Sequence, residues 1–294
     1  MRRRVLLCSI AILVATVIVL SSVAMASAKP RHAMHSVAQP GQLTRSVRAD
    51  RVRYRRHVFR QVTVRRDIAY ARVRNHAGVE ETLRLDVYAP RQDSARRRAT
   101  IVWLHPGGFT EGDKSIEARY ARDFAERGYV SIAIDYRLRP AMQWFDLEQR
   151  RHAAGDAYAD ATTSIRWIRR NALRYGVDAA HIFVAGYSAG AITAQEVAAP
   201  PDGSRSLVVG AMSIAGYADG PARAGLPPRL VFHGTRDYLM PYERDKVACS
   251  QARKLMNRCD LVTIVHGEHD IGFVNFAYIA ELTARFFAPI ANGD

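Results

Sequence analysis

A pentapeptide in the second half of the chain combines residue types that nucleophilic chemistry uses. It reads Gly186-Tyr187-Ser188-Ala189-Gly190, and it lies between a short apolar run at 182–185 and a helical pattern at 189–199. A serine on a tight strand-to-helix turn has its hydroxyl exposed above the sheet, and small neighbours let the backbone make that turn. A bare G-x-S-x-G arises often by chance, but this context predicts Ser188 as a nucleophile and not only a glycine turn.

A second glycine-rich segment, His105-Pro106-Gly107-Gly108-Phe109, ends a predicted strand at 99–104. Acyl transfer passes through a tetrahedral oxyanion, which backbone N–H groups aimed at that oxygen stabilise. Pro106 has no N–H to donate. The predicted donors are therefore the N–H groups of Gly107 and Gly108, together with that of Ala189. The alternative is a simple glycine-rich turn.

A serine nucleophile needs a base, and the base needs an orienting carboxylate. Asp237 ends the sequence HGTRD at 233–237, just past an apolar run at 229–232. His269 follows a second run at 261–265. Both residues therefore emerge at the carboxyl ends of predicted parallel strands, where open α/β sheets place their sites. The order serine, acid, histidine is the order of α/β-hydrolases.

Three other titratable residues compete for these roles. His266 lies at a strand end, where side-chain direction is tied to the sheet, whereas His269 follows Gly267 and can turn over the serine; His269 is favoured. Asp245 falls inside a predicted helix and is expected to be a solvated surface acid. Asp270, beside the base, either tunes it or is structural.

The elements that must position these residues alternate between strand and helix, which predicts a mainly parallel sheet with helices on both faces. Before that alternation, three β-branched runs at 61–65, 68–74 and 82–88 predict antiparallel strands at a sheet edge. In a predicted helix at 156–175, four residues form the apolar side: Ile165, Trp167, Ile168 and Leu173. The remaining strands are predicted at 99–104, 129–134, 182–185, 207–214, 229–232 and 261–265, and the remaining helices at 116–127, 189–199, 242–256 and 276–287.

Residues 61–289 resemble the bacterial carboxylesterases of the α/β-hydrolase superfamily, near the hormone-sensitive-lipase-like and feruloyl-esterase-like groups. The stretches that carry the resemblance are LDVYAP at 85–90, HPGGF at 105–109, AIDYR at 133–137, residues 160–190 and HGTRD at 233–237. The resemblance implies an α/β-hydrolase fold, the triad and oxyanion donors named above, and hydrolysis of carboxylic esters without metal or cofactor.

Two departures from that family stand out. Pro106 replaces the first glycine of the commoner His-Gly-Gly-Gly, at a position not expected to donate. Only a short Gly, Ala and Pro loop separates the strands ending at 214 and starting at 229, so the large cap of many relatives is absent there. Without cap walls, we expect short acyl groups on a soluble or polymer-borne alcohol. Trp144 and Phe145 either line the pocket or pack.

Two other functions remain open on the sequence. A serine peptidase of the prolyl-oligopeptidase type shares this catalytic domain, but such relatives carry a large propeller, and only about sixty residues precede the domain here. A non-catalytic binding module typically loses a triad residue, and this chain retains all three. Labelling by a fluorophosphonate separates enzymes from the binding module, and peptide against ester substrates separates the two enzymes.

The N-terminal segment, residues 1–28, reads as a signal peptide for export to the cell envelope, the periplasm or the exterior. Arg2 to Arg4 precede an apolar run at 5–20 and small residues ending at Ala28. If the segment is not cleaved, its uncharged stretch is long enough to serve as a membrane anchor. Cys8 leaves with it, so Cys249 and Cys259 remain as a predicted disulfide, with two buried thiols as the alternative.

The charge of the chain is concentrated just after this segment. The formal net charge is +15, and eleven Lys or Arg against one acid lie between Lys29 and Arg66. We expect residues 29–60 to form a basic linker or arm before a catalytic domain at 61–294. Such an arm suits anionic lipid or cell-wall polymer, or it is a solvated linker. Nucleic acid is not an expected partner, because no basic face interleaved with aromatic residues is present.

Overall fold

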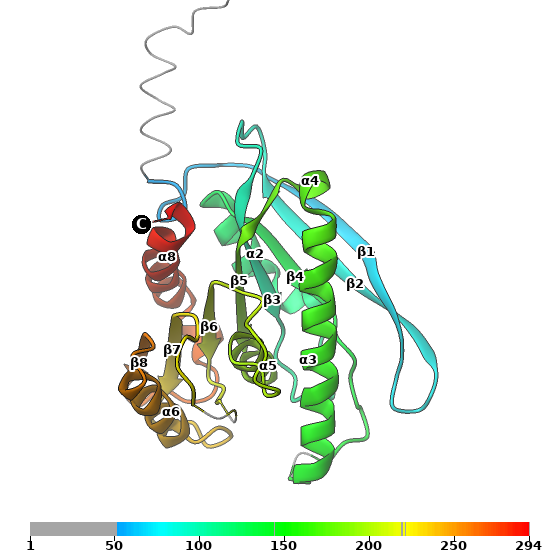
Figure 1. Cartoon of the computed structure of the whole chain (residues 1–294), viewed down its shortest axis with the longest axis vertical. Coiled ribbons are helices and arrows are strands. Elements are labelled where there is room, and N and C mark those ends of the chain that lie inside the picture. The colour runs from blue at the N-terminus through cyan, green and yellow to red at the C-terminus, as the bar shows by residue number, and fades with distance from the viewer. Residues whose placement is uncertain (1–51, 144, 219, 221, 294) are drawn as a thin grey trace, which may run out of the picture.

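The computed structural model describes residues 52–143, 145–218, 220 and 222–293. The predicted signal segment and residues 29–51 of the predicted arm lie outside them. The described chain forms one eight-stranded sheet in the order β1-β2-β4-β3-β5-β6-β7-β8 (Figure 1). Strands β3 to β8 run parallel to one another, and β1 and β2 form an antiparallel edge. The predicted fold class is confirmed.

The apolar runs of the sequence locate the central strands, although β5 starts five residues before its predicted start and β6 starts three residues after. The central strands are buried on both faces, as parallel sheets covered by helices require. The strands are β1 Val62–Arg74, β2 Glu80–Pro90, β3 Arg98–Leu104, β4 Val130–Ile134, β5 Val177–Tyr187, β6 Gly210–Ile214, β7 Arg229–Gly234 and β8 Cys259–Ile264.

The sequence predicted two separate strands at 61–65 and 68–74, but the structure has one edge strand, β1, in their place. It is one strand of 13 residues, and its pairing with β2 shifts register between Arg65 and Ile68. Asp67 has a φ of 56° at this point. An extra residue with an unusual φ is the mark of a β-bulge, which bends a strand without ending it. The polar residues here therefore mark a bulge and not a turn.

The helices cover both faces of the sheet. The buried residues of α3 and α5 pack in one core cluster, and those of α2 and α8 pack in the other. Figure 1 shows α3 running along one face over most of the sheet. The helices are η1 Lys114–Glu117, α2 Ala118–Glu126, α3 Leu147–Arg170, α4 Ala172–Tyr175, α5 Ala189–Ala198, α6 Tyr242–Lys254, α7 Ile271–Val274 and α8 Phe276–Asn292.

Helix α3 starts nine residues before its predicted start. The Asp146 carboxylate accepts hydrogen bonds from the backbone N–H groups of Glu148 and Gln149, both at 3.0 Å. This cap satisfies two of the N–H groups that a helix start leaves unpaired. The helix also ends earlier than predicted, at Arg170, and Leu173 in α4 is 88% exposed, so its predicted place on the apolar side is wrong.

A disulfide joins Cys249 in α6 to Cys259, the first residue of β8, as predicted. It closes a loop of ten residues, which in the chain-entropy view of disulfides stabilises the folded chain by about 2 to 3 kcal/mol. The bridge fixes α6 against the strand that leads to His269.

The last residues of the predicted arm, 52–60, pack against the domain. Tyr54 is buried, and its hydroxyl oxygen accepts a hydrogen bond from the Ala99 N–H at 3.0 Å. Arg53 forms two hydrogen bonds with the Asp93 carboxylate, which also binds Arg98. Within the described residues, no helix has both the length and the apolar character to cross a membrane.

Candidate active site

The backbone at Ser188 takes a conformation that is rare for any residue except glycine. Its φ is 54° and its ψ is −118°, between the end of β5 and the start of α5. Strain of this kind persists where the surroundings over-determine it. A Cβ at Gly186 would lie 2.2 Å from the Gly190 carbonyl oxygen, and one at Gly190 would lie 2.0 Å from that of Leu104. Both glycines are therefore required for this turn.

Ser188, His269 and Asp237 lie in one hydrogen-bonded chain. His269 Nε2 is 2.8 Å from Ser188 Oγ, and His269 Nδ1 is 2.8 Å from Asp237 Oδ2. Because the carboxylate only accepts, Nδ1 carries the proton and Nε2 is left to accept from the serine hydroxyl. This geometry suits removal of the serine proton by the imidazole.

The loops that carry the acid and the histidine are packed backbone to backbone. A Cβ at Gly234, at the end of β7, would lie 2.2 Å from the Gly267 carbonyl oxygen. That same oxygen accepts a hydrogen bond from the Arg236 N–H at 2.9 Å. The N–H of His266 donates to the Thr235 hydroxyl oxygen at 2.9 Å. The two loops thus hold each other in one arrangement.

The carboxylate of Asp237 is buried, and both of its oxygens accept hydrogen bonds. Its Oδ1 accepts from the backbone N–H groups of Leu239, at 3.0 Å, and Met240, at 2.8 Å. Burial by itself raises the pKa of Asp237, but hydrogen bonds from His233, His269 and Met240 outweigh it and hold that pKa well below its usual range. Asp237 is therefore ionised at neutral pH.

Tyr187, the residue before the serine, fixes the position of His269. Its hydroxyl donates to the His269 carbonyl oxygen at 2.8 Å. Its ring packs edge-on against Phe273 with the ring centres 5.1 Å apart. A Cβ at Gly272 would lie 3.1 Å from the Tyr187 ring, so glycine allows this close approach.

The glycine-rich segment after β3 forms a tight loop beside the serine. Gly107 has a φ of 126°, and a Cβ there would lie 2.0 Å from the Glu111 carbonyl oxygen. Gly108 follows with a φ of 61°. No hydrogen bond between described residues uses the N–H of Gly107, Gly108 or Ala189. These N–H groups are thus available to a substrate.

His105 supports this loop from below. Its ring stacks on Tyr136 with 4.2 Å between ring centres, and the Tyr136 hydroxyl donates to the His105 carbonyl oxygen at 2.7 Å. His105 Nδ1 is 2.7 Å from the Pro106 carbonyl oxygen, so Nδ1 carries a proton. Burial lowers the pKa of His105, which keeps its ring neutral.

A pocket of about 400 Å³ opens over Ser188 and His269. Its walls include the glycine loop, Met142, Leu239 and Phe273. Phe145 does not contribute to the walls and is 92% exposed, so it neither lines the pocket nor packs. Trp144 lies outside the described residues. In the part of the chain that the structure describes, no group of three His, Cys, Asp or Glu could hold a metal ion.

The competing titratable residues lie apart from the hydrogen-bonded chain of Ser188. His266 and Asp270 are exposed, and neither shares a hydrogen bond with the serine. The expectation for Asp245 is wrong, because it is 1% exposed and bonded to buried His233. Its first-turn position in α6 faces β7 and not solvent. Sequence reasoning missed His233 as well, although it opens the HGTRD sequence.

The sheet order, the strand-to-helix turn at Ser188 and the placement of Asp237 and His269 after β7 and β8 are those of an α/β-hydrolase. A family described as "Carboxylesterase family" matches residues 42–233. Because this match covers more than half of the chain, the protein belongs to the carboxylesterase family.

Solved structures and curated proteins agree with this family. Esterase 2 of Thermogutta terrifontis, phosphorylated by paraoxon, is 26% identical, with a TM-score of 0.66 over 80% of this chain and 96% of that one. Its butyrate-bound form is 25% identical, with a TM-score of 0.62 over 76% and 95%. Esterase LipC of Mycobacterium tuberculosis is 29% identical over 72% of this chain and 58% of its own length. The first curated relatives are matched over only 23 to 58% of their lengths.

Proposed function

We propose that the protein is a serine carboxylesterase in which Ser188 is the nucleophile, His269 the general base and Asp237 the orienting acid. The observation that carries this proposal is the hydrogen-bonded chain of these three residues at the floor of an open pocket. Membership in the carboxylesterase family supports it. The paraoxon adduct of the Thermogutta esterase supports a serine hydrolase, because such phosphorylation takes place on activated nucleophiles.

The reaction proceeds in two halves. Ser188 Oγ attacks the ester carbonyl carbon while His269 Nε2 takes the hydroxyl proton. The oxyanion that forms accepts hydrogen bonds from the N–H groups of Gly107, Gly108 and Ala189. The carbon–oxygen ester bond then breaks, and the leaving alcohol takes the proton from His269. Water, deprotonated by His269, attacks the acyl enzyme, and the carboxylic acid leaves as Ser188 regains its proton.

The experiment that tests this function uses the mature protein and a fluorophosphonate probe. One probe should attach per molecule, and mass spectrometry of the digested protein should locate it on Ser188. Ester substrates should be hydrolysed and peptide substrates should not. Hydrolysis of peptides in place of esters would instead identify a peptidase, and absence of labelling would indicate a binding module.

We predict a preference for short acyl groups, of roughly two to six carbons. The loop between β6 and β7 is short. Two of the apolar side chains that line the pocket, Leu239 and Phe273, are themselves exposed to solvent. Each added methylene therefore gains less than the roughly 0.8 kcal/mol of full burial. The butyrate-bound relative is consistent with short chains. The kcat/KM for p-nitrophenyl esters should fall beyond hexanoate; a steady rise from acetate to palmitate would refute the preference.

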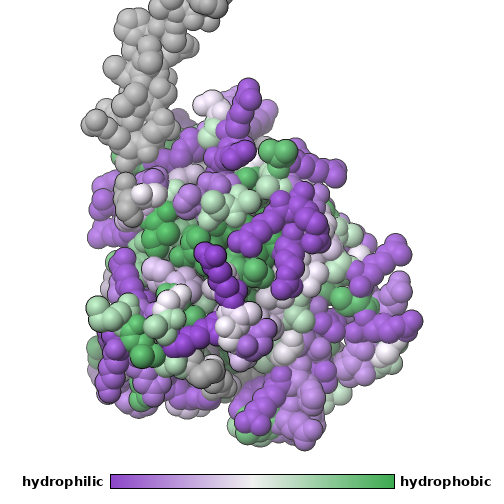
Figure 2. Space-filling view, in the orientation of Figure 1, coloured by the Kyte–Doolittle hydropathy of each residue, from purple (hydrophilic) through white to green (hydrophobic). Residues whose placement is uncertain are grey.

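We also propose that the protein is exported and contacts an anionic membrane surface through its basic N-terminal side. Three described segments meet at this end of the domain: residues 60–61, 91–98 and 174–176. The Arg91 N–H donates to the Gln61 carbonyl oxygen, and the Arg98 N–H donates to that of Gly176. This basic end exposes seven arginines, none of which has an ion pair with a described residue: Arg55, Arg56, Arg60, Arg91, Arg96, Arg97 and Arg174. Figure 2 shows largely hydrophilic side chains at the top, where α4 lies in Figure 1.

The basic end lies at the amino ends of β3 and β5, opposite the pocket at their carboxyl ends. Exposed Leu173 in α4 adds an apolar side chain that a bilayer surface can accept and a charged polymer cannot. The basic arm of the sequence precedes this end of the domain. On a membrane, the pocket would then face away from the lipid, which suits soluble or polymer-borne esters.

Vesicle binding tests this surface. The mature chain should sediment with phosphatidylglycerol-rich vesicles and not with phosphatidylcholine vesicles. Arg96→Glu with Arg97→Glu should weaken binding by roughly thirty-fold or more, at about 1 kcal/mol per lost charge. Arg72→Glu with Arg151→Glu changes the charge equally at exposed sites away from the basic end and is the matched control. Equal loss in both variants, or retention on cell-wall polymer alone, would refute the proposal.

A further inference from the structure

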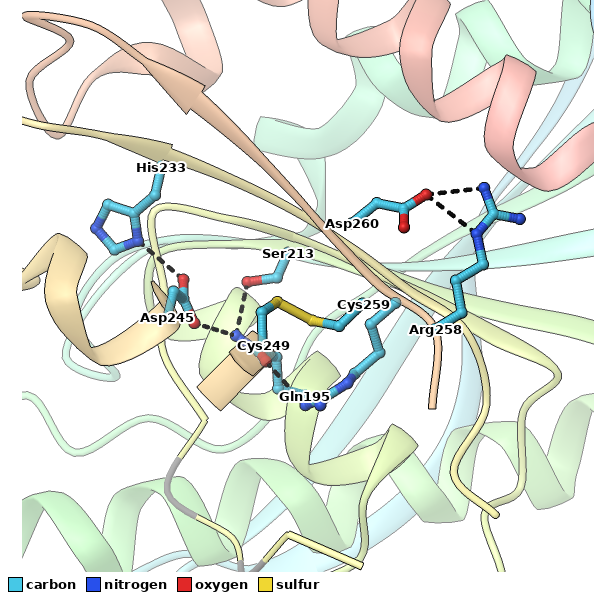
Figure 3. The surroundings of a disulfide bond; sticks show 9 residues. Gln195, Ser213, His233, Asp245, Cys249, Arg258, Cys259 and Asp260 are labelled. Atoms are coloured by element: carbon cyan, nitrogen blue, oxygen red, sulfur yellow. Dashed lines mark hydrogen bonds and ion pairs between the residues drawn. A yellow bond between two sulfur atoms is a disulfide. The ribbon is translucent and has the colours of Figure 1, made fainter. Parts of the chain in front are cut away.

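A second histidine lies behind the carboxylate of Asp237. His233 belongs to β7 and has no exposed surface. Its Nδ1 is 2.8 Å from Asp245 Oδ2, and its Nε2 is 2.8 Å from the Met240 carbonyl oxygen. The same Nε2 is 3.5 Å from Asp237 Oδ2. Figure 3 shows the His233 ring directed at Asp245.

These partners determine the protonation of His233. A carbonyl oxygen only accepts hydrogen bonds, so Nε2 carries a proton. The other oxygen of Asp245, Oδ1, accepts from Gln195 Nε2 at 3.1 Å, and as a carboxylate Asp245 also accepts at Oδ2, where it meets His233 Nδ1. Nδ1 of His233 therefore carries a proton too, and the ring is a cation paired with Asp245.

The other groups around the ring are consistent with this charge. Tyr242 of α6 packs edge-on at 5.8 Å between ring centres. Arg229 of β7 lies 3.4 Å from Gln195 Oε1 and interacts electrostatically with Asp245. Burial alone would lower the pKa of His233, but hydrogen bonds to Asp237 and Asp245 raise it to about 9. Among the described charged groups, the two carboxylates dominate.

The Asp237 carboxylate is thus held between two imidazoles. Its Oδ2 accepts from His269 Nδ1 and lies near His233 Nε2, while its Oδ1 is held by the backbone of the same loop. A cation on the far side of the acid has two effects. It holds the carboxylate in one orientation, and it offsets part of the negative charge that His269 experiences.

We propose that His233, anchored by Asp245, is a positioning residue that orients Asp237 toward His269 and limits how strongly Asp237 favours the protonated form of His269. The proposal rests on the proposed function, in which Asp237 is the orienting acid. Figure 3 shows that Asp245 in turn is bonded to Gln195, which donates to Ser213 Oγ at 3.1 Å. Residues of β6, β7, α5 and α6 therefore support the Asp237 carboxylate.

The direction of the effect on pH dependence follows from charge. With the cation removed, the charge of Asp237 is no longer offset, so Asp237 favours the cationic form of His269 more strongly. The base then becomes available only at higher pH. The Asp237 carboxylate also loses its fixed orientation, which lowers the rate, since misplacing a catalytic group by about 1 Å costs up to roughly 10²-fold.

The test compares the pH profiles of kcat/KM for p-nitrophenyl butyrate in the mature protein and its variants. His233→Gln keeps a donor but removes the charge; we expect kcat to fall by roughly 10-fold to 10²-fold and the acid limb to move upward. His233→Gln with Asp245→Asn removes both buried charges together and keeps the variant folded if the single change does not. Ser213→Ala alters the same buried network three hydrogen bonds from His233 and should leave the acid limb in place.

A measurement on the unaltered protein completes the test. With ¹⁵N-labelled histidine, one ring should show protons on both nitrogens at about pH 8, where an ordinary histidine is neutral. Its absence, or an unmoved acid limb in the His233 variants, would overturn the proposal. Failure of the proposed function would look different, because the wild type itself would then show no Ser188-dependent hydrolysis.

Discussion

Ser188→Ala is expected to lower kcat by about 10⁴ to 10⁶, because loss of a triad nucleophile removes the covalent step entirely. The folded structure should be retained, since the side chain of Ser188 is small and, among the described residues, its only side-chain hydrogen bond joins it to His269. The measurement is the hydrolysis of p-nitrophenyl acetate by the purified variant, with circular dichroism and thermal unfolding as controls for folding.

One result would contradict the assignment of Ser188 as the nucleophile. A variant that folds as the wild type does and hydrolyses the ester at the wild-type rate would show that Ser188 is not the nucleophile. Weak residual hydrolysis is expected in any case, because the oxyanion N–H groups and the pocket still act on a bound ester. Residual labelling by a fluorophosphonate at another serine would locate the alternative nucleophile.

His269→Ala is expected to be as damaging as the serine change. Without the imidazole, no group takes the Ser188 proton, and Asp237 loses one of the hydrogen bonds to its buried carboxylate. The nucleophile and the base of a triad act as one unit, so losing either alone costs about as much as losing the whole triad. Ester hydrolysis by the purified variant should therefore fall by a similar factor, roughly 10⁴ or more.

The chain offers a matched control three residues earlier. His266→Ala removes an exposed imidazole from the same loop and should have a mild effect, because within the described chain no hydrogen bond of its side chain is found and its backbone N–H donates to Thr235. Wild-type activity in His269→Ala, or an equal loss in both variants, would show that the base lies elsewhere.

The sequence predicted the central sheet well because buried parallel strands are short apolar runs between turns. It also placed Ser188 on its turn, since Gly186 and Gly190 are needed where a Cβ would strike the backbone. Asp237 and His269 could be chosen because strand ends converge at one edge of the sheet. Their mutual distances could not be predicted, because they depend on how the loops at Gly234 and Gly267 pack.

Other features depend on contacts that a local pattern does not record. Asp245 lies on a polar stretch of α6, and only its meeting with His233 makes it buried. The start of α3 was readable from Asp146 and Gln149, which have the spacing of a capping box, but the apolar period begins later. Leu173 follows the helical period of α3, yet the helix ends before it.

The disulfide has a consequence for where the protein can mature. Cys249 follows Asp245 by about one turn of α6, and Cys259 begins the strand that leads to His269. The bridge therefore joins the helix that anchors the acid side of the site to the strand that delivers its base. A chain that folds where thiols stay reduced lacks this covalent tie, so the rigidity of the proposed catalytic groups depends on the redox state of the compartment in which it folds.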